Sequence, residues 1–485
     1  MTDLAILTFG ILGQCLLGSA IAMALLGKKL VSTAEKKEGG WFIQQAELIG
    51  LSIVLGMSGT AYSLFLWSLY GGTLGRGSSW GLAILSAVSG LYCFWSCRNQ
   101  AAKNADLTKG DSKAPGRALV RFSAGLIFLL FVSQLVQTLM TPQRLWDERA
   151  IFGIKAAILF EDQTINSPSL TDPDFVQYHP KYPLLIPLAE QHIYSLLGRV
   201  DDRWSKLIFP LMSLGLVLTF AGVLQRHIRA SQAWLFALLL ATTPILAFDD
   251  YGFLSGQADA PVACFHGIAV LYLWDWFRSQ STELGQNRTL ILAAIAAAMT
   301  IFTKDEGIAL FLVDAGMLAL ILLVVFRRFA FAIIQTAIFV TITVLLIAPW
   351  FWHRSELPAT TEMTYANRFN IETMLEGMKT LAWSIPHMKN RMLMQAFTFG
   401  LTWWGLLLAL VTKVRRVIRP EQLLLLGDVG GAIAALLVAG MIAPTPVEFH
   451  LGGSSHRFLM QLVPVGILFM AGQWGCDKLS KSSES

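Results

Sequence analysis

The sequence predicts an all-α polytopic membrane protein, and two observations carry this prediction. Of the 485 residues, 54% are hydrophobic and only 14% are charged, and the mean hydropathy is +0.56. Soluble domains carry about 25% charged residues. The apolar residues lie in runs of about 18 to 22, the length that a helix needs to cross a bilayer core of about 30 Å. The composition therefore excludes a soluble enzyme and a disordered chain.

About thirteen membrane-spanning helices are expected from these runs. The first run is interpreted as a spanning helix and not as a signal peptide, because Asp3 precedes it, lysines follow it and it is too long for a signal sequence. The thirteen runs are 4–26, 48–70, 80–97, 121–140, 206–225, 233–248, 258–277, 289–303, 308–326, 331–350, 393–412, 422–443 and 457–475.

The loops between these runs alternate in charge. One set carries short clusters of lysine and arginine, and the positive-inside rule assigns it to the cytoplasm. The net charge of +5 thus reflects topology, and no nucleic-acid partner is expected. The alternation requires that Leu184–Leu197 does not cross, so we expect a helix that lies at or dips into the outer interface. The other set holds most acidic residues and is assigned to the outer side: 141–205, 249–257, 304–307, 351–392 and 444–456.

The first large outer loop, 141–205, contains the sequence QRLWDERA at 143–150. Its acid pair, Asp147 and Glu148, follows a spanning helix and precedes an amphipathic stretch, 151–160. Carboxylates this close to the bilayer are suited to a general base or a metal ligand. The alternative is a solvated pair that Arg144 and Arg149 balance.

Four further polar elements lie on the same predicted side. The first loop continues with YHPKYPLL at 178–185, which contains His179 and Lys181. The others are DDYG at 249–252 with GQAD at 256–259, TKDEG at 303–307, and SSHRFL at 454–459 with Pro464. Their order and sidedness are the main indication of function.

Taken in this order, these elements resemble the GT-C superfamily of integral-membrane glycosyltransferases, in particular the protein mannosyltransferase and aminoarabinose transferase group. The resemblance covers about 119–475. It divides the chain into 1–118, three extra amino-terminal helices with a basic cytoplasmic linker, the GT-C-like catalytic core 119–475, and a cytoplasmic tail, 476–485. It implies transfer of a hexosyl- or pentosyl-type sugar from a polyprenyl-phosphate donor to an acceptor on the extracytoplasmic side, with inversion.

The resemblance also suggests roles for individual residues. Asp147 is the candidate general base, and Glu148 is expected to orient it or to share its proton. The candidates for binding the substrate or its phosphate are His179, Lys181, Asp259, Lys304, Glu306, His456 and Arg457, with Arg457 the strongest because a guanidinium offers a bidentate fork. A divalent metal ion on Asp147, Asp259 and Glu306 is left open, and the cofactor is unknown.

Each candidate also has a structural interpretation. Arg457 could snorkel to the interface, Lys304 could balance a short charged turn, His179 could cap a turn, and Asp259 could cap a helix. The outer loop 351–392 is expected to be irregular and is a candidate lid, or else an aromatic anchor at the interface.

Two acids within apolar runs also need an explanation. Asp275 is expected to pair with Arg278 near the inner end of its helix, whereas Asp314 could line a lipid cavity.

Two other functions remain alternatives to a glycosyltransferase. A transporter or flippase of lipid-linked or anionic solutes would use Asp275 and Asp314 as coupling residues. A non-catalytic GT-C relative would act as an assembly subunit. The expected partners are the donor lipid, membrane lipids and a glycan, lipid or protein acceptor, and the expected location is the plasma (inner) membrane.

Overall fold

The computed structural model describes residues 2–34, 45–102, 116–279, 287–358 and 364–475, and within these ranges the chain is helical with no strand. The predicted all-α polytopic fold is confirmed. Among the described residues, eight segments are long and apolar enough to cross a membrane. They are Asp3–Gly27 within α1 (Asp3–Ala34), α3 (Ala46–Leu69), α5 (Arg117–Met140), Ser205–His227 with α9 (Ile208–His227), α12 (Asp259–Arg278), α14 (Glu306–Val324), α15 (Phe329–Glu356) and α22 (Pro420–Ile442).

The other five predicted spans are also helices, but most are short. Four have 10 to 17 residues: α10 (Ala230–Ala241), α13 (Asn287–Thr303), α20 (Thr402–Thr412) and α24 (Val463–Trp474). The fifth, α4 (Arg76–Ala102), has 27 residues. The run 233–248 breaks after Ala241 because Pro244 disfavours a helical residue before it and begins α11 (Pro244–Ala247).

Two predicted outer loops are largely helical, and for 351–392 this corrects the expectation of an irregular loop. In 351–392, α15 continues to Glu356, and the described residues beyond 363 form α16 (Thr364–Arg368), α17 (Ile371–Gly377), η6 (Met378–Thr380) and α18 (Leu381–Met394). Residues 444–456 belong mostly to α23 (Val447–Gln461). Arg457 therefore lies inside a helix and does not open one.

The segment Leu184–Leu197 forms α8 (Leu185–Leu197), and all 13 of its residues are buried in protein. At 1.5 Å per residue it is about 20 Å long, shorter than a bilayer core. Burial, followed by repulsion from Glu148, raises the pKa of Glu190 well above its ordinary value. Burial also lowers the pKa of His192 to about 4. Burial thus favours the neutral form of both side chains, which suits a helix that packs inside the protein and not at the lipid interface.

Helix α12 lies at the centre of the molecule. Every residue from Asp259 to Phe277 is buried. Helices α9, α13, α14, α22, α23 and α24 all pack against it. Its polar side chains are therefore shielded from lipid by other helices.

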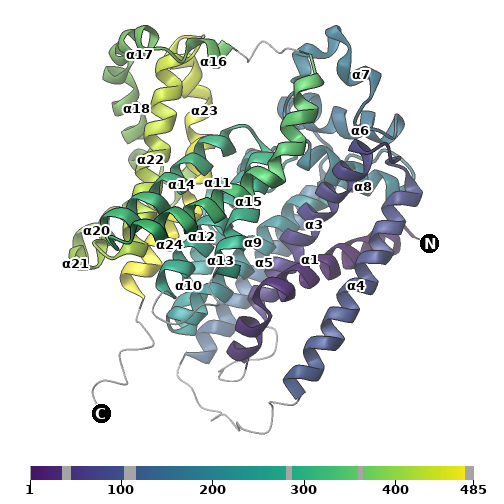
Figure 1. Cartoon of the computed structure of the whole chain (residues 1–485), viewed down its shortest axis with the longest axis horizontal. Helices are drawn as coiled ribbons and strands as arrows, with labels where there is room; N and C mark the ends of the chain where they lie inside the picture. Colours follow the sequence, from purple (N-terminus) through teal and green to yellow (C-terminus); the bar gives the residue numbers. More distant parts are fainter. Residues whose placement is uncertain (1, 35–44, 103–115, 280–286, 359–363, 476–485) are drawn as a thin grey trace.

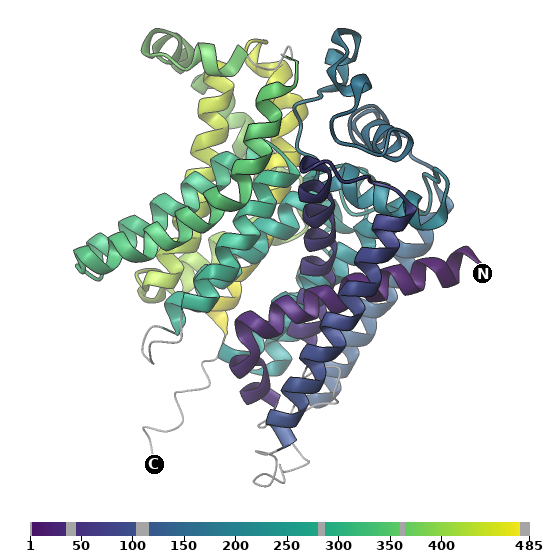
Figure 2. The same cartoon turned by 45° about the vertical axis from the view of Figure 1, so that its right-hand side comes forward.

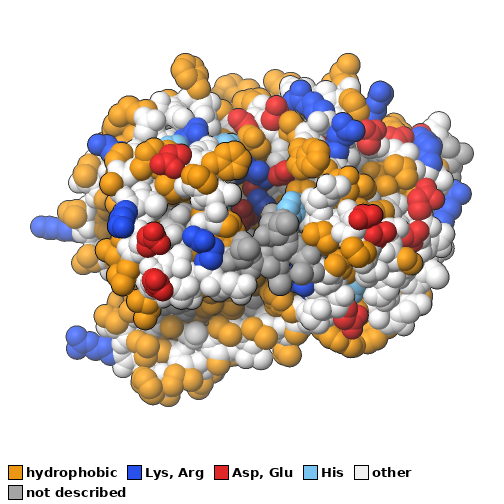
Figure 3. Space-filling model, turned by 90° about the horizontal axis from the view of Figure 1, so that it is seen from above, with side chains coloured by type: hydrophobic (Ala, Val, Ile, Leu, Met, Phe, Trp, Pro, Cys, Tyr) orange, Lys and Arg blue, Asp and Glu red, His pale blue; other side chains and the backbone are white. Residues whose placement is uncertain are grey.

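The predicted outer elements share one end of this bundle. In Figure 1, η2 (Asp147–Gly153) with α6 (Ile154–Glu161), α7 (Pro168–Thr171) and α8 lie toward the upper right, and α16 to α18 lie at the upper left with α23. The carboxyl-terminal ends of α4 and α24 point to the lower end. Figure 3 looks onto the upper end and shows acidic and basic side chains around a hollow near its centre.

The amino-terminal helices pack tightly onto the rest of the chain. Helix α1 crosses α3 obliquely (Figure 2), and the backbones meet at Gly18 and Gly56. A Cβ on Gly56 would lie 2.1 Å from the carbonyl oxygen of Gln14, so only glycine permits this approach. Helix α3 in turn packs along α9.

Candidate active site

Five charged side chains from four separate segments meet near the upper end of α12, and we call them the outer ion cluster. They are Asp147 of η2, Asp259 of α12, Lys304 and Glu306 around the turn between α13 and α14, and Arg457 of α23. All five were singled out from the sequence. The fold thus brings together residues that are up to 310 positions apart.

Arg457 connects the two aspartates of this cluster. Its Nη2 atom donates to Asp147 Oδ2 at 2.5 Å and to Asp259 Oδ2 at 2.6 Å, and its Nε donates to Asp259 Oδ2 at 3.0 Å. Its guanidinium also lies over the ring of Tyr251, 5.1 Å from the centroid. Burial opposes the charge, yet the carboxylates of Asp259 and Asp147 raise the pKa of Arg457. The guanidinium is therefore a fixed cation.

Asp259 is the buried centre of the cluster. It is fully buried at the first turn of α12, where the helix dipole favours an anion, but its carboxylate makes no capping hydrogen bond. Oδ1 instead accepts from Lys304 Nζ at 2.8 Å, and Lys304 Nζ also lies 2.9 Å from Glu306 Oε2. Although burial opposes the charge of the ammonium, these two acids raise the pKa of Lys304.

Asp147 and Glu148 are adjacent in the chain but face different surroundings. They begin a π-helical segment, a rare geometry that is often found at functional sites. The side chain of Asp147 is 23% exposed and reaches Arg457, so it is open to a substrate.

Glu148 is fully buried, and its carboxylate accepts hydrogen bonds from backbone amides of two loops. One carboxylate oxygen accepts from the amides of Arg144 and Leu145 at 2.9 and 3.1 Å. The other accepts from the amide of Gly256 at 2.8 Å and pairs with Lys206 Nζ at 3.2 Å. These contacts connect the first outer loop to the loop that leads into α12.

The remaining sequence candidates lie outside the outer ion cluster. His179 has a left-handed backbone, with φ 54°, and its carbonyl accepts from Lys155 Nζ at 2.5 Å. Its ring stacks on Tyr182, and Lys181 is half-buried in the same turn. His456 is closer, with its ring edge-on to Tyr251 at 4.8 Å, and burial followed by Arg391 lowers its pKa.

Sequence reasoning missed several residues that support this site. Lys155 and Lys206 are buried lysines whose ammonium groups donate to backbone carbonyls of loops. The only sequence signal for Lys155 was a lysine within an apolar stretch, IKAAILF. Arg354 forms a bidentate ion pair with Asp305, with both hydrogen bonds at 2.8 Å. This pair connects the end of α15 to the turn before α14. Tyr251 was quoted within its motif but given no role.

The two intramembrane acids have partners that the sequence did not indicate. Asp275 pairs with His227 at 2.6 Å and Arg226 at 3.2 Å, whereas the predicted partner Arg278 lies 3.7 Å from Glu421. Asp314 lies against His266, with 3.8 Å between Oδ2 and Nε2.

The carboxylates proposed as metal ligands already pair with cations. Lys304 and Arg457 lie between Asp147, Asp259 and Glu306. With two cations against three acids the cluster has a formal charge of −1. A metal ion at these three residues stays a prediction.

A comparison with protein-family models gives a match to part of the chain. Residues 199–355 of 485 match the family model described as dolichyl-phosphate-mannose-protein mannosyltransferase. The matched range contains Asp259, Lys304 and Glu306, whereas Asp147 and Arg457 lie outside it. No curated protein and no solved structure matches the chain. Over residues 199–355 the expected resemblance is thus confirmed, and the match to the mannosyltransferase family supports a membrane glycosyltransferase of the GT-C type.

Proposed function

We propose that this protein transfers a sugar from a polyprenyl-phosphate donor to a hydroxyl acceptor at the outer ion cluster, on the extracytoplasmic side of the membrane, with inversion. The observation that carries the proposal is the position of Arg457 between Asp147 and Asp259. A general base and a phosphate-binding cation are the two groups that this reaction requires, and here they are in contact.

The proposed step forms one bond to the anomeric carbon and breaks one. Asp147 accepts the proton of the acceptor hydroxyl as its oxygen attacks the anomeric carbon of the sugar. The bond from that carbon to the phosphate oxygen breaks on the opposite face, and the polyprenyl phosphate leaves with the electron pair. Arg457 stabilises the charge that develops on the phosphate, because a guanidinium binds phosphate oxygens with two parallel hydrogen bonds.

The buried acids keep the cations in position for this role. Asp259 holds Arg457 on one oxygen and Lys304 on the other, so both cations face the same place without a donor present. Pre-positioned charge of this kind needs no rearrangement as the reaction proceeds. In the bound state the donor phosphate would compete with Asp147 for Arg457 and so free the carboxylate to act as a base.

An apolar groove between α5 and α10 offers a path for the lipid chain of the donor. Its lining is almost entirely leucine, and the groove opens along the middle of α5 and the second half of α10. The outer ends of these two helices lead to Asp147 and, through α11, to Asp259. The lining residues are Leu126, Leu129, Leu130, Leu235, Leu238, Leu239 and Thr242.

The proposal is tested with purified protein in liposomes that contain a polyprenyl-phosphate sugar labelled in the sugar. Wild type is expected to cleave the donor, and Asp147→Asn to do so about 10²- to 10⁴-fold more slowly, the usual effect of losing a general base. Arg457→Ala should also lose activity. Asp174→Asn is the matched control, because Asp174 is an exposed acid of the same loop.

Each rival function gives a different result in the same liposomes. A flippase would move intact lipid-linked sugar across the bilayer without cleavage, and the buried intramembrane acids are the observation that favours it. An assembly subunit would do neither. Equal cleavage by Asp147→Asn and wild type would refute the role of Asp147 as base.

A further inference from the structure

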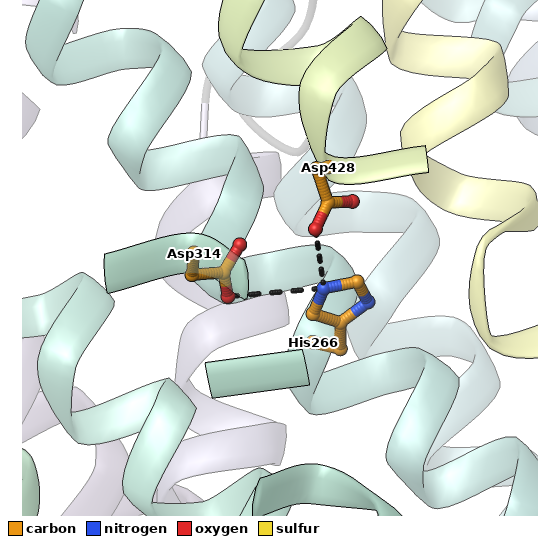
Figure 4. Close-up of side chains that lie close together, drawn as sticks. All are labelled: His266, Asp314 and Asp428. Carbon is orange, nitrogen blue, oxygen red and sulfur yellow. Dashed lines mark ion pairs between the residues drawn. The ribbon is translucent and has the colours of Figure 1, made fainter. Parts of the chain in front are cut away.

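Three side chains converge in the membrane interior below the outer ion cluster: His266 of α12, Asp314 of α14 and Asp428 of α22 (Figure 4). We call them the inner triad. Both carboxylates face the same ring nitrogen, with His266 Nε2 3.4 Å from Asp428 Oδ1 and 3.8 Å from Asp314 Oδ2. All three residues are at most 1% exposed.

The orientation of His266 makes this arrangement unfavourable unless Nε2 is protonated or a metal ion lies among the three groups. His266 Nδ1 lies 3.3 Å from the carbonyl oxygen of Gln461. A carbonyl can only accept, so Nδ1 carries the proton and a neutral imidazole presents the lone pair of Nε2 to the carboxylates. Three acceptors then face one another.

The hydrogen bonding of the inner triad is also incomplete. His266 Nε2, one oxygen of Asp314 and both oxygens of Asp428 are buried and have no hydrogen-bond partner. Buried polar groups normally have such partners, and two unneutralised carboxylates within a membrane are costly. A cation among the three groups would satisfy them and cancel their charge of −2.

We propose that the inner triad binds a divalent transition-metal ion, with Zn²⁺ as the best match. One imidazole nitrogen and two carboxylate oxygens are ligands that Zn²⁺ accepts, and the three atoms lie within 4.8 Å of one another. Tetrahedral bonds of about 2.0–2.1 Å separate two ligands by about 3.3 Å, close to the 3.4 Å distance between His266 and Asp428. A backbone carbonyl on the second ring nitrogen is the usual way to orient a metal-binding histidine.

The position of the inner triad in the fold suggests a structural role for this ion. His266 follows Asp259 by seven residues on α12, Asp314 follows Glu306 by eight on α14, and the carbonyl of Gln461 follows Arg457 by four on α23. Spacings of four, seven and eight place both members of a pair on one face of a helix. The ion would therefore join α12, α14 and α22 beneath the residues that position the outer ion cluster.

Metal content tests this proposal without any donor substrate. The full-length protein is purified, stripped with a chelator, reloaded with Zn²⁺ alone and freed of excess metal. We expect about one Zn²⁺ per chain, a higher apparent melting temperature than that of the stripped protein, and a visible absorption spectrum after loading with Co²⁺. His266→Ala and Asp428→Asn should lose the bound metal. His353→Ala, a buried histidine on α15, should keep it.

Two results would overturn the proposal. One is a reloaded wild type with no bound Zn²⁺, no change in melting temperature and no Co²⁺ spectrum. Protons would then neutralise the carboxylates of the inner triad. The other is undiminished Zn²⁺ in folded His266→Ala and Asp428→Asn protein. The wild-type measurements decide the matter if a variant fails to fold. Donor cleavage is scored separately, so the proposed function can fail while the metal site stands, and the reverse.

Discussion

At the scale of single residues, Asp147 and Glu148 show how adjacent acids acquire different roles. Asp147 is partly exposed and shares Arg457 with Asp259. Glu148 is fully buried, accepts three backbone hydrogen bonds and pairs with Lys206. These different surroundings are the basis for proposing chemistry at Asp147 and loop positioning by Glu148.

Glu148→Gln is expected to destabilise the protein more than Asp147→Asn does. Removing the charge of Glu148 leaves the buried ammonium of Lys206 with its contacts to Thr141 and Pro142 but without its paired carboxylate. Loss of one partner of a buried ion pair typically costs about 3–5 kcal/mol, and the apparent melting temperature in detergent measures the loss. Adding Lys206→Met should recover part of it, because the unpaired charge is then gone. A Glu148→Gln protein as stable as wild type would contradict the positioning role.

The sequence revealed the residues of the outer ion cluster but not their partners. Lys304 and Glu306 are close in the chain, so a pair between them was foreseeable. Contacts of Arg457 with Asp147 and Asp259 span 310 and 198 positions and depend on how helices pack. Likewise Asp428 lies in an apolar run, and its position beside His266 follows only from the packing of α22 against α12.

At the scale of helices, each of the thirteen predicted apolar runs contains a helix, but the helix ends depended on local chemistry and on contacts. Pro244 ended the run 233–248 early. Gly400, with φ 57°, separates α19 (Ala396–Phe399) from α20 within the run 393–412. Hydropathy did not reveal α23, because its polar residues, such as His456, face other protein elements and not lipid.

The close crossing of α1 and α3 predicts that alanine is tolerated at one glycine of α3 and not at another, so the second variant serves as the control for the first. A Cβ on Gly56 would lie 2.1 Å from a backbone oxygen of α1, so Gly56→Ala must push the helices apart and is expected to cost about 1–3 kcal/mol. At Gly59 the nearest atom is a flexible end of Ile21, 3.4 Å away, so Gly59→Ala should be neutral or slightly stabilising. Thermal unfolding of the two variants in parallel checks this, and equal melting temperatures would argue against the close crossing.

At the scale of the whole molecule, the amino-terminal helices are joined to the rest of the chain by buried polar contacts as well as by packing. Glu47 of α3 lies 3.1 Å from Arg226 of α9 and accepts from Tyr272 of α12 at 2.8 Å. At the other end, Gln191 of α8 donates to the carbonyl of Leu74 at 2.6 Å. The sequence placed these helices in 1–118 and indicated no function for them. Their contacts suggest that they support α9, α12 and the first outer loop.

The chain beginning at residue 119 is therefore expected not to fold by itself. Without α3, the buried Arg226 and Tyr272 lose Glu47 and the packed face of α9 is exposed. Size-exclusion chromatography of 119–485 should show aggregation, whereas co-expression of 1–118 as a separate chain should restore a single symmetric peak and donor cleavage. Recovery by the separate piece would show that the contacts matter and not the covalent link. If 119–485 alone gave a monodisperse protein with the melting temperature of the full chain, the amino-terminal helices would have to serve another purpose, such as binding a partner.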